Sequence, residues 1–221
     1  MEGVEVNGKE RIFSWFSEQV KTRNPKGNKP VVCVMDGDRG LWKMLGSCLV
    51  NVVCILDLFH VMERLWSAAH CFYPEDSEAA KAFVSDRLER ILNGEVGRVI
   101  GGLRQMVTKQ NLRGSRAKQF SAVIGYLERN RQFMHYHEYL ANGYPIGSGV
   151  AEGACRHLVK DRMELTGMRW GLHGAQAILH LRAVYLNDDW EKFQTHRMKT
   201  ECSRLYPYRN AVIRSKRRHA A

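Results

Sequence analysis

The sequence has little proline, no long apolar run and no closely paired cysteines. Only 5 of the 221 residues are proline and 19 are glycine, which excludes a collagen-like or low-complexity chain. No stretch approaches the roughly 18 apolar residues of a membrane-spanning helix, and residues 1–30 lack the apolar core of a signal peptide. We therefore expect a soluble, cytoplasmic protein without a membrane partner.

The 6 cysteines are scattered, and none forms a CxxC motif with another. This spacing is typical of reduced structural thiols. The pairs His70–Cys71 and Cys155–His157 contain zinc-ligand residue types, but structural zinc sites usually combine two closely spaced ligand pairs. The sequence therefore does not favour a zinc site.

Basic residues are in excess and are clustered. The 34 Lys and Arg residues against 23 Asp and Glu residues give a formal net charge of +11. Residues 101–131 hold seven basic residues against a single acid, and no acid follows Glu201, where Tyr206 and Tyr208 alternate with arginines. Clustered Lys and Arg attract phosphates and aromatic rings can stack on bases, whereas the alternative is a solvated basic face. We expect a polyanionic partner.

The first third of the chain alternates between helical periodicity and short apolar runs rich in β-branched residues. Each run is too short for a helix, and each ends at an aspartate, Asp36 or Asp57. Continuous apolar strands separated by helices indicate a parallel sheet covered on both faces. We therefore predict an α/β fold with these elements in order: helix 10–22, strand 31–35, helix 39–48, strand 51–56 and helix 58–70.

The remainder of the chain shows helical periodicity only. Apolar stripes predict a helical section over residues 74–140, with breaks near Gly94 and Gly114. A glycine-flanked loop at 144–149 then leads into a further helix. The predicted helices after this loop cover 150–163, 173–186 and 189–198.

Three acids stand where they could meet at one site. Asp36 and Asp57 follow the predicted strands, and Glu152 lies in the first turn of the helix after the glycine loop. Carboxylates that converge in a half-buried site require a cation, and Mg²⁺ prefers such oxygen ligands. The structural alternatives stay open, because Asp36–Gly37 is a turn signal, Asp57 can cap a helix, and Glu152 suits a helix N-terminus or a pair with Arg156.

Four segments carry a resemblance to a known family. They are DGDRGLW at 36–42, ILDLFHVMERLW at 55–66, GYPIGSGVAEGACRHLVKDRMELTGMRW at 143–170 and GAQAILHLRAVYLNDDWEKF at 174–193. In these segments the chain resembles the bacterial insertion-sequence DDE transposases of the ISKra group, which are related to Mutator-like transposases. The similarity extends over nearly the whole chain.

The resemblance implies a partial RNase H-like fold, parallel strands with helices, interrupted by an all-helical insertion. Asp36 would be the second catalytic acid and Glu152 the third, and both would be ligands of Mg²⁺ or Mn²⁺. Asp57 and His60 stand where related families place a Cys-x-x-His motif, and we interpret them as close to the site. The implied divisions are a partial core at 1–73, the insertion at 74–142, the remainder of the core at 143–200 and a basic tail at 201–221.

The implied activity is DNA transposition in the bacterial cytoplasm, with Mg²⁺-dependent cleavage and strand transfer of phosphodiester bonds. The partners would be transposon ends and target DNA, and a homo-oligomer would bring paired ends together. We expect phosphate contacts from six basic residues: Arg104, Lys109, Arg113, Lys160, Arg162 and Arg169.

One departure from the family concerns its first catalytic aspartate. That residue lies on a strand upstream of the position that corresponds to Met1, and residues 1–30 contain no strand that ends in an acid. We therefore expect a transposase fragment that another polypeptide completes. The alternative is a truncated, catalytically inactive nucleic-acid-binding module.

Overall fold

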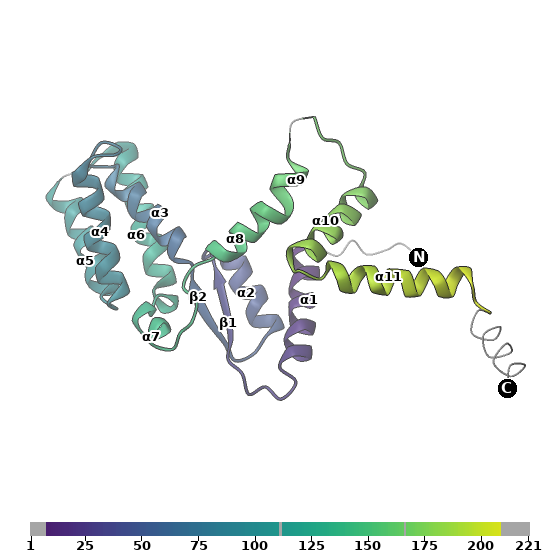
Figure 1. The fold of residues 1–221 in the computed structure, drawn as a ribbon. Coiled ribbons are helices and arrows are strands. Elements are labelled where there is room, and N and C mark those ends of the chain that lie inside the picture. The colour runs from purple at the N-terminus through teal and green to yellow at the C-terminus, as the bar shows by residue number, and fades with distance from the viewer. Residues whose placement is uncertain (1–7, 111, 166, 209–221) are drawn as a thin grey trace, which may run out of the picture. The chain divides into compact units, whose positions relative to one another are not determined.

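The structure is a computed structural model that describes residues 8–110, 112–165 and 167–208 (Figure 1). Most of the predicted basic tail, from residue 209 onward, lies outside the described residues. The chain forms two compact units, Met1–Gly149 and Val150–Ala221.

The first unit begins with alternating helices and strands, which confirms the predicted α/β order. Its two strands are parallel and pair in register from Val31 with Val52 to Met35 with Leu56. The elements are α1 (Gly8–Arg23), β1 (Val31–Met35), α2 (Arg39–Cys48), β2 (Val52–Leu56) and α3 (Leu58–Ala69). Each lies within two residues of its predicted bounds.

The sheet is less buried than the sequence predicts. All five residues of β1 are partly exposed, and only Ile55 and Leu56 of β2 are buried. Among the described residues the sheet has two strands, so each strand has a neighbour on one side only. The burial that the sequence predicts for both strands is therefore incomplete for β1.

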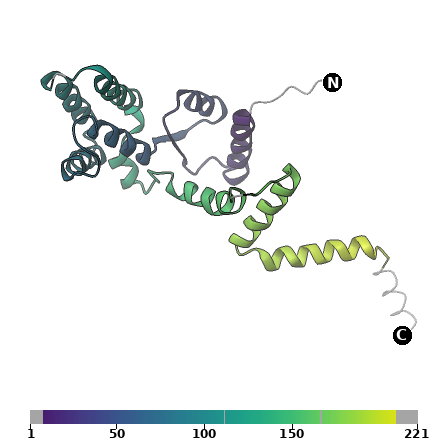
Figure 2. The same cartoon turned by 90° about the horizontal axis from the view of Figure 1, so that it is seen from above.

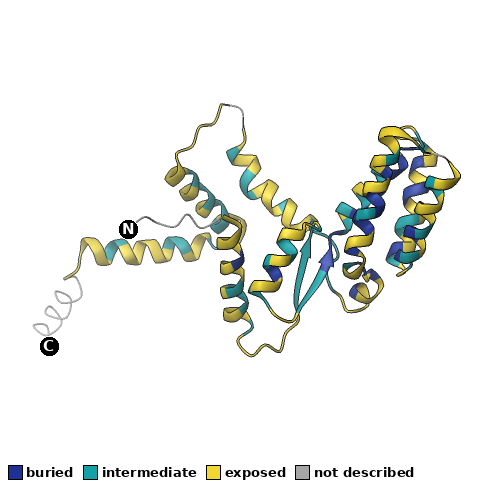
Figure 3. Ribbon diagram, turned by 180° about the vertical axis from the view of Figure 1, so that it is seen from behind, coloured by how far each residue is buried: buried dark blue, intermediate teal, exposed yellow. Residues whose placement is uncertain are grey.

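The helical section after residue 74 forms the main core. Its longer helices lie together (Figure 2), and α3 contacts both α4 and α6. The predicted apolar stripes face this core, where Ile91, Leu103, Phe120 and Leu127 are completely buried (Figure 3). The elements are α4 (Glu78–Leu92), α5 (Val96–Lys109), α6 (Gly114–Asn130), the 3₁₀ turn η1 (Arg131–Phe133) and α7 (Tyr136–Ala141).

Tyrosine hydroxyls join this core to the sheet. Tyr136 donates a hydrogen bond to the carbonyl of Leu56 at 2.8 Å, and Tyr139 donates to the carbonyl of Cys54 at 3.2 Å. A strand with an open edge leaves carbonyl groups without a partner in the ladder. These two side chains satisfy such groups on β2 and fix the helical section against it.

The second unit consists of helices without a buried residue among those described. The helix predicted over 150–163 is interrupted in its middle by a turn of π-helix, and the last helix runs further than predicted. Arg182 donates hydrogen bonds to the carbonyls of Leu158 and His157. The elements are α8 (Gly149–Cys155), η2 (Arg156–Lys160), α9 (Asp161–Met163), α10 (Leu172–Leu186) and α11 (Trp190–Leu205). In the described part of the chain no helix is both long and apolar enough to cross a membrane.

The turn after β1 depends on Gly37, which has a φ of +87° and no space for a side chain. A Cβ atom there would lie 2.8 Å from Leu56 Cδ1 and 2.9 Å from Asn130 Nδ2. We expect Gly37→Ala to lower the free energy of unfolding by about 1–3 kcal/mol, because it adds both backbone strain and a clash. Urea unfolding followed by circular dichroism measures this change.

The matched control is Gly46→Ala. Gly46 lies inside α2 with nothing within 4 Å of its would-be Cβ, so alanine there should stabilise the protein by about 0.5–1 kcal/mol. Equal effects of the two substitutions would contradict this account of the turn.

Candidate functional site

Two of the predicted site residues lie side by side at the carboxyl edge of the sheet. Asp36 and Asp57 directly follow Met35 and Leu56, which are paired across the strands, and the backbone N–H of Asp57 donates to the carbonyl of Met35 at 2.8 Å. In parallel sheets this edge collects functional groups. Both aspartates therefore lie at this edge, and their meeting at one metal site stays a prediction.

Asp57 is a buried carboxylate, with 1% of its surface exposed, and it accepts four hydrogen bonds. Oδ1 accepts from the backbone N–H groups of Phe59 and Ser148, both at 3.2 Å. Oδ2 accepts from the hydroxyl of Ser148 at 2.6 Å and lies 2.7 Å from Nδ1 of His60. Protein donors thus occupy both oxygens, so Asp57 does not fit the place of a metal ligand.

These contacts set the charge state of Asp57. Burial raises its pKa, but the hydrogen bonds from Ser148, His60 and Phe59 together hold the pKa below its ordinary value. The carboxylate is therefore ionised at neutral pH. It caps α3 and fixes the glycine loop in the same contact, which confirms the capping alternative for this residue.

His60 is oriented by Asp57. Since the carboxylate only accepts hydrogen bonds, Nδ1 of His60 is the donor in this contact. The side chain is 35% exposed. The ring orientation of His60 is thus set by a buried acid, next to the edge where Asp36 lies.

Asp36 differs from Asp57 because its side chain is exposed. Its Oδ1 accepts the backbone N–H of Asp38 at 3.0 Å, and its carbonyl accepts the hydroxyl of Tyr126 at 2.8 Å. The neighbouring Asp38, and not Asp36, caps α2 by accepting the N–H of Leu41. An exposed carboxylate on a fixed turn fits the chemistry of a Mg²⁺ ligand, which is a hard oxygen donor.

The charges of both aspartates act on the hydroxyl of Tyr126. Burial raises its pKa to about 12, and the negative charges of Asp36 and Asp57 act in the same direction, while Arg64 opposes them. The guanidinium carbon of Arg64 lies 4.9 Å from the centre of the tyrosine ring. The hydroxyl therefore stays protonated and keeps its bond to the Asp36 backbone.

Glu152 belongs to the second unit, where it is exposed in the first turn of α8 and has an interaction partner. Its meeting with Asp36 stays a prediction. Among the described residues, no group of three or more His, Cys, Asp or Glu side chains is placed to hold a metal ion.

The six predicted phosphate-contacting residues are all exposed. Arg104 lies 3.3 Å from a carboxylate oxygen of Glu128, so its charge is partly neutralised within the protein. Lys109 ends α5 and Arg113 precedes α6, whereas Lys160, Arg162 and Arg169 belong to the second unit.

Sequence reasoning did not select Ser148, Tyr126 or Arg39, whereas Arg129 belongs to the basic cluster at 101–131. The string GSG at 147–149 is a signal for Ser148, because a Cβ on Gly147 would lie 2.9 Å from the ring of Phe59. Only glycine lets the loop approach closely enough for Ser148 to reach Asp57. The tyrosine carries no local signal, since its place beside the Asp36 turn depends on how α6 packs.

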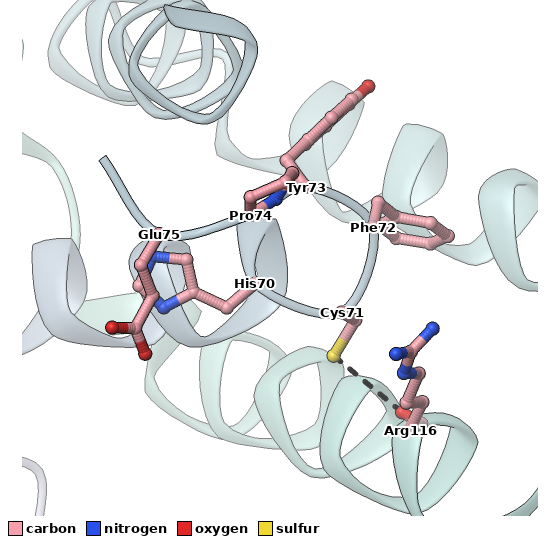
Figure 4. Close-up of a pocket in the computed structure, with 7 residues that line it drawn as sticks. All are labelled: His70, Cys71, Phe72, Tyr73, Pro74, Glu75 and Arg116. Atoms are coloured by element: carbon pink, nitrogen blue, oxygen red, sulfur yellow. Dashed lines mark hydrogen bonds between the residues drawn. The ribbon is translucent and has the colours of Figure 1, made fainter. Parts of the chain in front are cut away.

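A separate hollow of about 310 Å³ lies at the turn after α3 (Figure 4). Its Cys71 thiol donates toward the carbonyls of Ser67 and Arg116 at 3.4 and 3.8 Å, and burial raises its pKa. The thiol is therefore neutral and engaged with the backbone. The hollow is lined by His70, Cys71, Phe72, Tyr73, Pro74, Glu75 and Arg116.

No protein-family model matches the chain, and neither a curated protein nor a solved structure was found to be similar to it. The resemblance to ISKra-group transposases stays a prediction.

The bond from Ser148 to Asp57 should stabilise the fold. Ser148→Ala removes the 2.6 Å donor from a buried carboxylate, and we expect the free energy of unfolding to fall by about 1–3 kcal/mol. Ser121→Ala is the matched control, because Ser121 is exposed on α6 and should change stability by less than about 0.5 kcal/mol. Urea unfolding at pH 7 distinguishes the two, and equal values would show that the contact does not stabilise the fold.

The same contact predicts a pH dependence. The lowered pKa of Asp57 means that its contribution to stability is complete above its ordinary pKa and is lost as the pH falls through the folded-state value. Between about pH 5 and pH 2, Ser148→Ala should therefore lose less stability than the wild type. Urea midpoints at several pH values test this, and parallel curves for the two proteins would contradict it.

Proposed function

We propose that this chain binds DNA and contributes to Mg²⁺-dependent phosphodiester cleavage and strand transfer, as a DDE-type transposase or a portion of one. The observation that carries most weight is the contrast between the two aspartates at the sheet edge. Asp36 is exposed on a fixed turn, whereas Asp57 is buried and saturated with protein donors. This contrast supports Asp36 as the catalytic acid and Asp57 as the residue that positions its surroundings.

In this proposal the two parallel strands and their helices belong to an RNase H-like core. The all-helical elements α4 to α7 would be the insertion between the second and third acids. The order of elements along the chain supports this assignment, since the insertion lies between Asp36 and Glu152.

Asp36 and Glu152 would hold the metal ion in the complete site. Mg²⁺ would stabilise the attacking and leaving oxygens of the phosphodiester displacement. The chain's own contribution is to hold the Asp36 backbone through Tyr126 and to fix the orientation of His60 through Asp57.

The charge of the chain supports a DNA partner. The net charge is +11, and the basic residues concentrate in the helical section and the carboxyl-terminal stretch. Binding driven by phosphate contacts releases counterions, so it weakens steeply as salt increases. Two element ends must be brought together in transposition, which a homo-oligomer of the chain would accomplish.

A non-catalytic nucleic-acid-binding module is the second candidate. The commitment of both Asp57 oxygens to protein donors favours it, because this takes one carboxylate of the sheet edge out of metal binding. Both candidates predict salt-sensitive DNA binding. They differ in their response to Mg²⁺.

Substitution of the two proposed metal ligands tests the catalytic role. Asp36→Asn and Glu152→Gln keep the size of each side chain and remove its charge, so each should lower Mg²⁺-dependent cleavage and strand transfer by about 100-fold or more. The assay uses duplexes from the DNA that flanks the coding sequence. It is run with the chain alone and with the chain joined to any in-frame upstream segment.

Glu18→Gln is the control, because Glu18 is an exposed acid on α1 and its loss should leave cleavage unchanged. Cleavage that survives both test substitutions would refute the assignment of Asp36 and Glu152. Salt-sensitive DNA binding that is indifferent to Mg²⁺, with no cleavage in either form, would favour the non-catalytic module.

A further inference from the structure

A hollow of about 280 Å³ lies beside the turn that carries Asp36. Its walls come from two parts of the first unit, the turn before α2 and the end of α6. Its volume is near the lower limit of typical ligand pockets. The residues that line it are Gly37, Arg39, Trp42, Arg129, Asn130, Gln132 and Phe133.

Two exposed arginines from different elements line this hollow. Arg39 is the first residue of α2, and Arg129 lies in the last turn of α6. Among the described residues no carboxylate lies within 4 Å of either guanidinium, whereas Arg90, Arg98 and Arg104 each have such a partner. Two unneutralised cations at one hollow attract an anion, and a guanidinium fork matches the geometry of phosphate oxygens.

The hollow is shaped by side chains that are held in place. Trp42 and Phe133 stack with their ring centres 4.3 Å apart. Asn130 is buried and donates from Nδ2 to the carbonyl of Tyr126 at 3.0 Å. Gly37 is pressed against Asn130, which fixes the turn to the wall of the hollow. The arginines therefore extend from a rigid frame.

The basic surface continues beyond this hollow. A neighbouring depression of about 500 Å³ shares Arg129 and Gln132 with it and adds Arg131 and His135. It also contains Glu128, but the carboxylate of Glu128 pairs with Arg104. Adjacent basic hollows that share one arginine suit an extended chain of phosphates better than a single small anion.

We propose that Arg39 and Arg129 together bind one backbone phosphate of a nucleic-acid strand, next to Asp36. The inference rests on the proposed function, since it assigns the phosphodiester substrate to a particular surface of the same site. A phosphate in this hollow would place the strand beside the turn of Asp36. The group that the two arginines recognise is a phosphate, and either a nucleic acid or free inorganic phosphate can supply it.

The first experiment measures duplex DNA binding by fluorescence anisotropy from 0.05 to 1 M salt, for which about 0.9 logarithmic units of slope correspond to one phosphate contact. Arg39→Gln and Arg129→Gln should each lower the slope by about 0.9. The loss of affinity caused by each substitution should therefore be roughly eightfold greater at 0.1 M salt than at 1 M salt. Because both arginines hold one phosphate, the double variant should weaken binding by far less than the product of the two effects. Lys21→Gln removes the same charge from the exposed end of α1 and should leave the slope unchanged.

Arg39→Lys and Arg129→Lys test the need for the guanidinium fork. Each keeps the charge and should recover only part of the lost affinity. Both arginines are exposed, so the variants should unfold at the wild-type temperature. Variants that bind DNA with the wild-type slope would overturn the proposed phosphate site while leaving the proposed DNA-binding function intact.

The second experiment titrates the wild-type chain with inorganic phosphate and follows the arginine Nε–H signals by NMR. The two signals that vanish in the lysine variants should shift together. If they shift while the wild type shows no salt-dependent DNA binding, the hollow takes free phosphate, and both the nucleic-acid partner and the proposed function are overturned. If neither signal shifts and the slopes are unchanged, the hollow binds no phosphate.

Discussion

The side chain of Asp57 carries a charge in a place that water does not reach, and the surrounding chain is arranged to supply its hydrogen bonds. A buried carboxylate without hydrogen-bond donors destabilises the folded state by roughly several kcal/mol. The donors of Asp57 must therefore come together for the fold to form. Those donors are Ser148 and Phe59, with His60 beside them. They come from the start of α3 and from a loop 91 residues further along the chain. One charge thus joins the end of the sheet, the following helix and the glycine loop.

The tyrosines act in a complementary way on the backbone. Tyr126, Tyr136 and Tyr139 donate to carbonyls at or near the carboxyl ends of the strands. Burial raises the pKa of each, so each remains a donor at neutral pH. A helical section that could pack in many ways is thereby oriented by three directional bonds. The bond from Tyr126, on α6, thereby positions the turn that carries Asp36.

The candidate site combines an acid with bases that do not neutralise it. Asp36 lies near Arg39 in sequence, yet no ion pair within 4 Å forms between them in the described structure. In the proposed function, a cation would bind at the carboxylate and a polyanion at the guanidinium groups.

The sequence by itself determined the elements of the first unit, because alternating apolar runs, aspartate caps and glycine breaks are local signals. It also placed Asp36 and Asp57 at one edge, since residues after parallel strands share that edge. Only the tertiary structure decided that Asp57 is buried and Asp36 exposed. That difference depends on Ser148 and on the packing of α6, which lie about 90 residues away. The arginine hollow likewise exists only because α6 ends beside the start of α2, a contact that no local pattern encodes.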